Sequence, residues 1–283
     1  MSNLNTKADT GPIFPGNIQN SAKNILLPKE GNNNDITNLL CKKMSKDQIY
    51  DLKENMLHVW CISLDELQQF LPVLRRNLSE DELSRSEMYH FQKDKNSFIL
   101  RRSILRILIS NYLEIDVRQI QFCCGKWGKP GIASNYCNKP FNFNLSHSKN
   151  LLLYAFARKR EVGIDIEHVR PIPEAAQIVE SNFSNKEKKV FSELSEDLRK
   201  ESFFRLWTRK EAFLKATGKG LDQSLDSVDA TSSDGFLQIQ KNEEISSNWH
   251  IEDLFPAPGF SAAYAIEGTA PLKCVFQRGT ACE

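Results

Sequence analysis

Apolar positions along this chain switch between alternating and helical spacing, and these switches divide the sequence into strands and helices. Residues 57–62 are dense in apolar and β-favouring side chains, which predicts a strand, and residues 64–70 are predicted to be helical. A helix over 98–113 is predicted from the i, i+4, i+7, i+8 stripe of Leu100, Ile104, Ile107 and Leu108. Another helix begins at Ser79, because Glu82 three residues later completes a capping box.

Strands and helices are interspersed without strict alternation in the rest of the chain. Further helices are predicted at 174–180, 185–192 and 198–217, and Gly218 and Gly220 end the last of them. Further strands are predicted at 119–124, 141–145, 151–157, 162–167, 236–240, 249–254, 261–266 and 272–277. This order of elements indicates an α+β or mixed α/β class.

The first 55 residues differ in composition from the remainder. They are rich in Asn, Lys, Gly and Pro and have few aromatic side chains. Such a segment buries too little apolar surface to offset the entropy lost on ordering, so residues 1–55 are predicted to be a flexible extension with a short helix near 36–43. The first residues lack the features of a signal peptide, and no apolar run reaches a membrane-spanning length, so we expect a cytoplasmic protein with no membrane partner.

Charge and cysteine usage narrow the classes of partner. Lys and Arg total 37 against 36 for Asp and Glu. This balance argues against a nucleic-acid-binding protein, and any anion site must be local. The seven cysteines form no C-x-x-C pair and no zinc spacing, which predicts reduced thiols. Cys123 and Cys124 lie in an apolar stretch and are predicted to be core residues, with a redox role as the weaker alternative.

Two carboxylates stand two residues apart on the strand predicted at 162–167. Asp165 and Glu167 therefore share one face, whereas Ile164 and Ile166 point to the other, toward a core. Adjacent carboxylates raise each other's pKa unless a cation lies between them, and hard oxygen ligands suit Mg²⁺. Taken alone, the pattern is more often the acidic edge of a solvated strand.

A second candidate group lies on the helix predicted at 198–217. Trp207, Glu211 and Lys215 follow one another at four-residue intervals and so share one helix face. A Glu four residues before a Lys is also an ordinary helix-stabilising pair, worth about 0.2–0.5 kcal/mol. By itself, the segment is typical of a partly buried helix with a surface ion pair.

Together, the separated motifs resemble the 4'-phosphopantetheinyl transferases. The resemblance extends from about residue 57 to 267 and depends on the order, spacing and residue types of the motifs. Its downstream motifs are Gly163-Ile164-Asp165-Ile166-Glu167, Trp207-x-x-Lys210-Glu211-Ala212 with Lys215, and Gly218-x-Gly220-Leu221. Its upstream motifs are Gly128-Lys129-Pro130 and Phe143-Asn144-Leu145-Ser146-His147-Ser148, which look like coenzyme A-binding segments.

The length of the chain resembles the longer, surfactin-synthetase-activating (Sfp-like) type. That resemblance implies an α+β fold in which two similar α/β halves of one chain form the active site at their junction, and it implies a monomer. The N-terminal half, which would bind coenzyme A, is expected at 56–160. The C-terminal half, with the magnesium and catalytic motifs, is expected at 161–283.

The resemblance also implies an activity and roles for the motif residues. The enzyme would transfer the 4'-phosphopantetheine group from coenzyme A to a serine of an acyl or peptidyl carrier protein, and would release adenosine 3',5'-bisphosphate. Asp165, Glu167 and Glu211 would hold Mg²⁺. Glu211 would accept the serine proton, directly or through a bound water, and Lys215 would stabilise or protonate the leaving oxygen.

Coenzyme A contacts follow from the same resemblance. Residues expected to contact the coenzyme or to place charge near it are Arg85, Arg102, Lys129, Ser146, His147 and Lys210. Arg85 and Arg102 can equally be solvated helix charges, and without the motif match His147 would be a half-buried histidine after a strand.

Two other functions remain open on the sequence alone. A metal-dependent phosphohydrolase acting on coenzyme A-like pyrophosphates would use the same carboxylate trio, but would leave the Gly-Lys-Pro turn and the segment 207–221 unexplained. A non-catalytic binding module would be favoured by the loss of a motif carboxylate, and none is lost.

Overall fold

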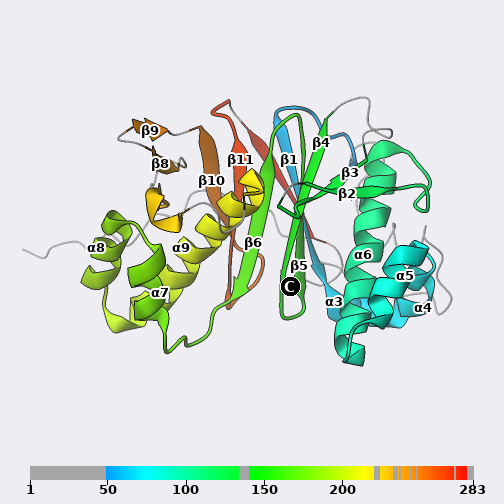
Figure 1. The fold of residues 1–283 in the computed structure, drawn as a ribbon, viewed down its shortest axis with the longest axis horizontal. Helices are drawn as coiled ribbons and strands as arrows, with labels where there is room; N and C mark the ends of the chain where they lie inside the picture. The colour runs from blue at the N-terminus through cyan, green and yellow to red at the C-terminus, as the bar shows by residue number, and fades with distance from the viewer. Residues whose placement is uncertain are drawn as a thin grey trace, which may run out of the picture.

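The fold is that of a computed structural model, which describes residues 49–125, 127–133, 140–219, 224–231, 235, 237–241, 244–246, 248–270 and 272–278. Two sheets face each other at the centre, and helices cover the outer side of each sheet (Figure 1). The mixture of packed helices and largely antiparallel strands confirms the α+β class. In these ranges, no helix combines the length and the apolar character that crossing a membrane requires.

The sheet of the first half has the strand order β12-β1-β5-β4. These strands are β1 (Met56–Ser63), β4 (Phe141–Ser148), β5 (Leu151–Arg158) and β12 (Lys273–Arg278). Both faces of β1 and β5 are buried, because alternate side chains pack into different cores. Trp60 and Tyr154 face the helices of this half, whereas Val59 and Leu153 face the second sheet.

In the described part of the chain, four helices cover the outer face of this sheet. They are α3 (Leu64–Leu67), α4 (Leu71–Arg75), α5 (Glu80–Glu87) and α6 (Gln92–Leu113). The predicted capping box is present, with Ser79 at the N-cap of α5 and the Glu82 carboxylate accepting from the Ser79 N–H at 3.0 Å. Helix α6 begins six residues before the predicted start, because its first turns are polar and carry no apolar stripe to detect.

The second half has a three-stranded sheet of order β10-β11-β6. Its strands are β6 (Val162–His168), β10 (Trp249–Leu254) and β11 (Phe260–Glu267). Its helices are α7 (Ala175–Asn182), α8 (Asn185–Glu193) and α9 (Glu196–Thr217). Helix α9 packs across β6 and β11 and ends at Gly218, which adopts a left-handed φ of 64°. Gly220, the second predicted stop residue, lies outside the described residues.

Smaller pieces complete the described chain. A hairpin of β2 (Phe122–Cys124) and β3 (Pro130–Ile132) stands beside β4, and β7 (Val228–Asp229), β8 (Gln238–Lys241) and β9 (Glu244–Ser246) form a small sheet. Short 3₁₀ helices occupy Gln68–Phe70 and Leu225–Ser227. Cys123 and Cys124 are exposed in the hairpin, so the prediction that they are core residues is wrong. Among the described residues, their short strand pairs only with β3, which leaves the two cysteines uncovered.

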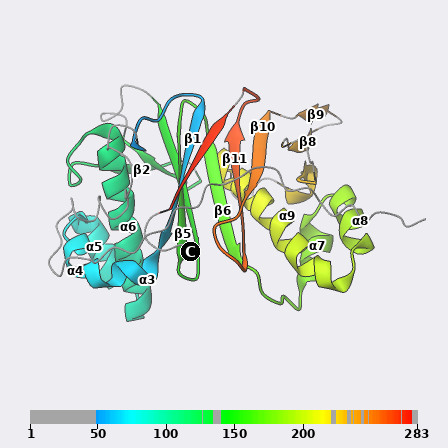
Figure 2. The ribbon, with the colours of Figure 1, turned by 180° about the vertical axis from the view of Figure 1, so that it is seen from behind.

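The two halves do not begin and end where the sequence predicts. Ile49, Tyr50 and Leu52 are buried in the core of the first half, so packed structure begins before residue 56. Strand β12 returns from the second half and pairs in parallel with β1 (Figure 2). The earlier part of the expected extension, including the helix near 36–43, lies outside the described residues.

Gly163 allows β6 and α9 to approach closely. A Cβ atom built on Gly163 would lie 2.0 Å from the Ala212 carbonyl oxygen and 2.4 Å from the Ala216 amide nitrogen. Backbone atoms inside a helix cannot move aside as a flexible side chain can. Only glycine therefore fits this position at the observed distance between the two elements.

Gly163→Ala is expected to lower the free energy of unfolding by about 1–3 kcal/mol or more, because the added methyl group must push α9 away from β6. Urea unfolding followed by circular dichroism measures this change. Gly125→Ala is the matched control, since its Cβ would meet only the Lys129 carbonyl oxygen, at an ordinary 3.5 Å. Equal stability of the two variants would contradict the packing argument.

Candidate active site

A row of polar side chains on β4 holds β6 in place where the two halves meet. Asn144, Ser146 and Ser148 alternate along β4 and so lie on one face. The Asn144 side-chain oxygen accepts from the Ile164 N–H at 3.0 Å, and the Ser146 hydroxyl donates to Asp165 Oδ1 at 2.8 Å. Side chains of the first half thus bond directly to the strand that carries the motif carboxylates.

Ser148 continues this row to the second carboxylate. Its hydroxyl donates to Glu167 Oε2 at 3.1 Å and accepts from the His168 N–H at 3.0 Å. Arg170 also donates to Glu167 Oε2, at 3.3 Å. The carboxylate of Glu167 is therefore oriented from both halves of the molecule, while part of it remains accessible.

Helix α9 places Glu211 and Lys215 on the side of β6 that bears Asp165. Lys215 Nζ lies 2.6 Å from Asp165 Oδ1 and 2.9 Å from the Ser146 hydroxyl oxygen. Glu211 lies one helical turn before Lys215, on the same face. The predicted grouping of Asp165, Glu211 and Lys215 therefore occurs in space.

The carboxylates of this group are held in an unfavourable environment for negative charge. Burial raises the pKa of Asp165, with a smaller contribution from the charge of Glu167, although the Lys215 ammonium and the Ser146 hydroxyl act in the opposite direction. Burial, followed by the charges of Asp165 and Glu167, raises the pKa of Glu211. Asp165 Oδ2 is buried and has no hydrogen-bond partner in the described part of the chain. An additional cation at this point would reduce the repulsion between the carboxylates and would give Asp165 Oδ2 a partner.

The donor set fits a magnesium ion in its chemistry. Carboxylate oxygens are the ligands that Mg²⁺ prefers, and Asp165 Oδ2 is an unused acceptor beside Glu167 and Glu211. Across the described ranges, no three His, Cys, Asp or Glu side chains lie close enough together, as placed, to hold a metal ion. The other oxygen of the Asp165 carboxylate, Oδ1, already accepts a hydrogen bond from Lys215 Nζ. These residues can therefore supply magnesium ligands, but their carboxylate oxygens do not surround one common position in this structure.

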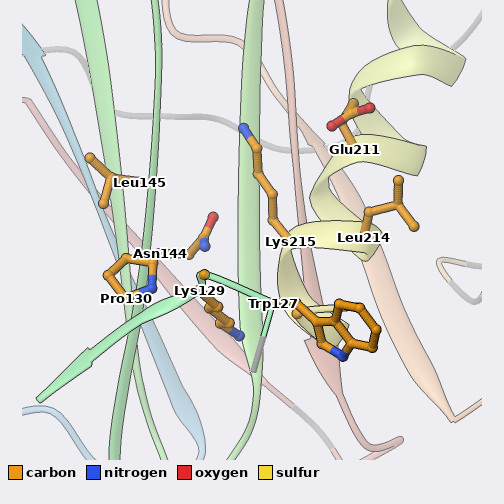
Figure 3. Close-up of a pocket in the computed structure, with 10 residues that line it drawn as sticks. Trp127, Lys129, Pro130, Asn144, Leu145, Glu211, Leu214 and Lys215 are labelled. Atoms are coloured by element: carbon orange, nitrogen blue, oxygen red, sulfur yellow. The ribbon is translucent and has the colours of Figure 1, made fainter. Parts of the chain in front are cut away.

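An open pocket of about 400 Å³ lies at the junction of the halves, next to this group. One wall comes from β4 and the turn before β3, and the other comes from α9 (Figure 3). Its lining residues are Trp127, Gly128, Lys129, Pro130, Asn144, Leu145, Glu211, Leu214, Lys215 and Gly218. A ligand in this pocket would contact both halves and would lie beside Glu211 and Lys215.

Lys129 lines the pocket with its backbone and stem, but its ammonium group is directed into the protein. Nζ donates to Glu161 Oε2 at 2.7 Å, to the Val162 carbonyl at 3.1 Å and to the Ala216 carbonyl at 2.7 Å. These bonds use all three N–H groups and connect the β2–β3 turn to the end of α9. This placement gives Lys129 a structural role, and the expected phosphate contact would require these bonds to break.

Lys210 does not face the pocket. Its side chain is fully buried, its Nζ lies 2.7 Å from the buried Glu187 carboxylate, and it donates to the carbonyls of Leu225 and Val228. It follows that Lys210 has no access to coenzyme A in this structure, which corrects the expectation of a charge near the coenzyme. The reason is helical geometry, since residues adjacent in a helix point about 100° apart.

The two arginines expected over the nucleotide differ in their surroundings. Arg102 donates to Glu82, and its guanidinium lies 3.6 Å from the centre of the Phe122 ring. Arg102 is therefore a paired, stacked side chain and not a solvated charge. Arg85 is exposed, with its guanidinium 5.6 Å from the centre of the Phe98 ring, and remains accessible to a ligand.

His147 lies beside Arg101, a residue that the sequence analysis did not select. The Arg101 guanidinium donates to His147 Nε2. Because a guanidinium can only donate, Nε2 must accept, and the ring is neutral with its proton on Nδ1. Burial and the charges of Arg101 and Lys215 lower the pKa of His147 to about 4, although the residue keeps an exposed edge.

Sequence reasoning missed several residues at the site, and some had a detectable signal. Ser148 and Asn144 share the strand parity of Ser146, which could have identified them. Arg101 lies off the apolar stripe of α6, where a charged residue is free to face a ligand. Trp127 lines the pocket and is nearly half exposed, but a single aromatic residue in a turn gives no sequence pattern that could have identified it.

Comparison with known proteins identifies the family. A family model described as the 4'-phosphopantetheinyl transferase superfamily matches residues 161–266. A second model, described as the N-terminal part of 4'-phosphopantetheinyl transferase, matches residues 60–158. Together they span both halves of the described fold.

Two curated relatives are similar over most of their length. The chain is 32% identical to 4'-phosphopantetheinyl transferase HetI of Nostoc sp., over 77% of this chain and 90% of that protein. It is 28% identical to 4'-phosphopantetheinyl transferase Sfp of Bacillus subtilis, over 71% of this chain and 86% of that protein.

Another relative and one solved structure match shorter segments. The human L-aminoadipate-semialdehyde dehydrogenase-phosphopantetheinyl transferase is 30% identical over 54% of this chain and 52% of that protein. A holo-[acyl-carrier-protein] synthase structure from Thermotoga maritima has a TM-score of 0.29 at 22% identity, over 39% of this chain and 64% of that one, too weak to bear on the fold. The two family models and the long matches to HetI and Sfp show that the chain belongs to the 4'-phosphopantetheinyl transferase superfamily, in its longer, Sfp-like type.

Proposed function

We propose that this transferase moves the 4'-phosphopantetheine group of coenzyme A onto a serine hydroxyl of an apo acyl or peptidyl carrier protein. The reaction depends on Mg²⁺ and gives the holo carrier protein and adenosine 3',5'-bisphosphate. The observation that carries the proposal is the pocket between β4 and α9, which brings Glu211 and Lys215 beside the Ser146–Asp165 pair.

The chemistry requires one bond to form and one to break. The carrier serine oxygen bonds to the phosphorus that carries pantetheine, and the bond from that phosphorus to the bridging pyrophosphate oxygen breaks. A serine hydroxyl is a weak nucleophile until a base accepts its proton. Glu211 is suited to this task, because its raised pKa makes it a stronger base than an ordinary carboxylate.

Lys215 is placed to act on the leaving group. Its ammonium donates to Asp165 and Ser146, and the Lys215 side chain lines the pocket. A cation there stabilises the negative charge that develops on the departing phosphate oxygen. Asp165, Glu167 and Glu211 would hold the metal, which when bound would neutralise and orient the pyrophosphate.

Other parts of the proposal follow from the same arrangement. Both walls of the pocket come from one chain, so we propose that the enzyme is active as a monomer. The carrier protein would approach the open side of the pocket, where its serine can reach Glu211. The cytoplasmic location stays a prediction from the sequence.

Intact mass spectrometry of an apo carrier protein tests the reaction. After incubation with this enzyme, coenzyme A and Mg²⁺, the carrier is expected to gain the mass of one phosphopantetheine group. EDTA should abolish the gain, and excess Mg²⁺ should restore it, because the buried carboxylates need a cation to accept a pyrophosphate. Breakdown of coenzyme A without any carrier modification would instead indicate a phosphohydrolase.

A further inference from the structure

Lys129 joins the two walls of the pocket to each other. Its ammonium, on a side chain that is only 17% exposed, donates to the Glu161 carboxylate and to the carbonyls of Val162 and Ala216. Its stem lies against the end of α9, because a Cβ built on Gly218 would lie 3.2 Å from Lys129 Cδ. One side chain of the first half is thus fastened to the start of β6 and the end of α9.

The turn that carries Lys129 needs support from outside its own hairpin. Strands β2 and β3 pair with each other and with no other strand in the described part of the chain, and a two-stranded hairpin is marginally stable by itself. The open end of the hairpin packs on the first half through Phe122, which contacts Arg102 and Phe143. The opposite end is the turn with Trp127, and its position depends on what it contacts across the pocket.

The same ammonium also completes the end of α9. The last four carbonyls of a helix have no partner inside the helix, and Ala216 supplies one of them. A positive charge at this end is favourable, because the helix dipole concentrates negative charge there. Lys129 therefore stabilises both the turn and the last turns of the helix that carries Glu211 and Lys215.

We propose that Lys129 and Glu161 are positioning residues that hold the two walls at the separation coenzyme A requires. This inference rests on the proposed function, in which coenzyme A occupies the pocket and contacts both walls at once. The apparent affinity of such a ligand falls in proportion to the fraction of molecules whose walls are correctly placed. Lys129 acts through the turn and the helix, and its ammonium does not touch the reacting groups.

Glu161 distinguishes this role from direct contact between Lys129 and a phosphate. If the ammonium bound a phosphate, Glu161 would compete for it, and Glu161→Gln would strengthen coenzyme A binding. If the ammonium holds the walls together, Glu161→Gln weakens binding. The structure favours the second case, since the Lys129 ammonium points away from that of Lys215 and already uses all three N–H groups (Figure 3).

Calorimetry of the full chain with coenzyme A tests the prediction. Lys129→Met is expected to raise the Kd by roughly 10- to 100-fold, because it removes charged hydrogen bonds to two carbonyls. Glu161→Gln should raise it by only about 2- to 5-fold, since that carboxylate is 46% exposed. The double variant should bind about as weakly as Lys129→Met alone. Lys53→Met is the matched control, an exposed lysine paired with Asp51.

Steady-state kinetics gives a second readout. In Lys129→Met, the KM for coenzyme A should rise by more than kcat falls, because bound coenzyme A itself brings the two walls together. A variant that lost kcat and kept its KM would contradict a role in positioning the walls.

Hydrogen exchange of the ligand-free chain, followed by mass spectrometry, tests the contact without any coenzyme. In Lys129→Met, amides of the β2–β3 hairpin and of residues 211–218 should exchange faster than in the wild type. Amides of β5 should keep their wild-type rate, since the loss is local. Faster exchange in β5 as well would show general destabilisation and would count against the proposal.

The remaining results separate this inference from the proposed function. Tighter coenzyme A binding by Glu161→Gln, or unchanged binding by Lys129→Met, would overturn the inference alone. If the wild-type chain neither bound coenzyme A nor modified a carrier protein, the proposed function would be wrong, and the role of Lys129 in coenzyme binding would be wrong with it.

Discussion

Glu211→Gln is expected to lower kcat for carrier modification by about 10²–10⁴-fold, the usual range for loss of a general base. The amide has the shape of the carboxylate but cannot accept the serine proton, and it is a poorer metal ligand. The change should leave the fold intact, because Glu211 makes no hydrogen bond or ion pair within the described chain. Removing its charge also reduces repulsion with Asp165 and Glu167, so the melting temperature should stay constant or rise.

The measurement is the rate of carrier modification with saturating coenzyme A and Mg²⁺, together with a thermal unfolding curve. Glu201→Gln is the matched control, an exposed glutamate of the same helix that lies away from the pocket. A Glu211→Gln variant that kept more than about a tenth of the wild-type kcat would rule out Glu211 as the base. A drop in activity that merely followed a lower melting temperature would also count against it.

The largest expected loss of stability comes from Lys210→Met. Lys210 and Glu187 are both fully buried and lie 2.7 Å apart, and the ammonium also satisfies the Leu225 and Val228 carbonyls. Methionine has a similar length but leaves the Glu187 charge without its partner. Breaking one side of a buried pair costs about 3–5 kcal/mol, so the free energy of unfolding should fall by that amount.

A double variant shows whether the unpaired charge is the cause. Glu187→Gln in the Lys210→Met background should recover part of the loss, since a neutral amide is less costly to bury and its oxygen can still accept from the Ala230 N–H. Urea unfolding of the wild type, both single variants and the double variant gives the coupling between the two sites. Additive effects would contradict the argument, and Lys189→Met, at an exposed position of α8, should change little.

The parts of the site that were predicted correctly depend on short-range geometry. Asp165 and Glu167 share a face because strands repeat every two residues, and Glu211 and Lys215 share one because helices repeat every 3.6. Both periods are visible in the sequence. The structure therefore agrees with the predicted strand at 162–167 and the long helix that follows, with only small shifts in their ends.

The parts that were missed depend on contacts between distant segments. Lys129 and Lys210 are both lysines within strong motifs, and nothing local indicates that one bonds to the end of α9 and the other to a buried glutamate. The Arg101–His147 contact likewise joins residues 46 positions apart. The partners of a charged side chain are decided by tertiary packing, which a single sequence does not display.

The return of β12 to the first sheet has a consequence for the order of folding during synthesis. Strand β1 can pair with β5 early, but its other edge gains its partner only when residues 273–278 have left the ribosome. At typical elongation rates of 5–20 residues per second, the interval between the synthesis of β1 and the synthesis of β12 is on the order of 10–40 s. During this time an apolar strand edge is open to wrong partners, so the nascent chain should be most vulnerable to aggregation just before β12 emerges.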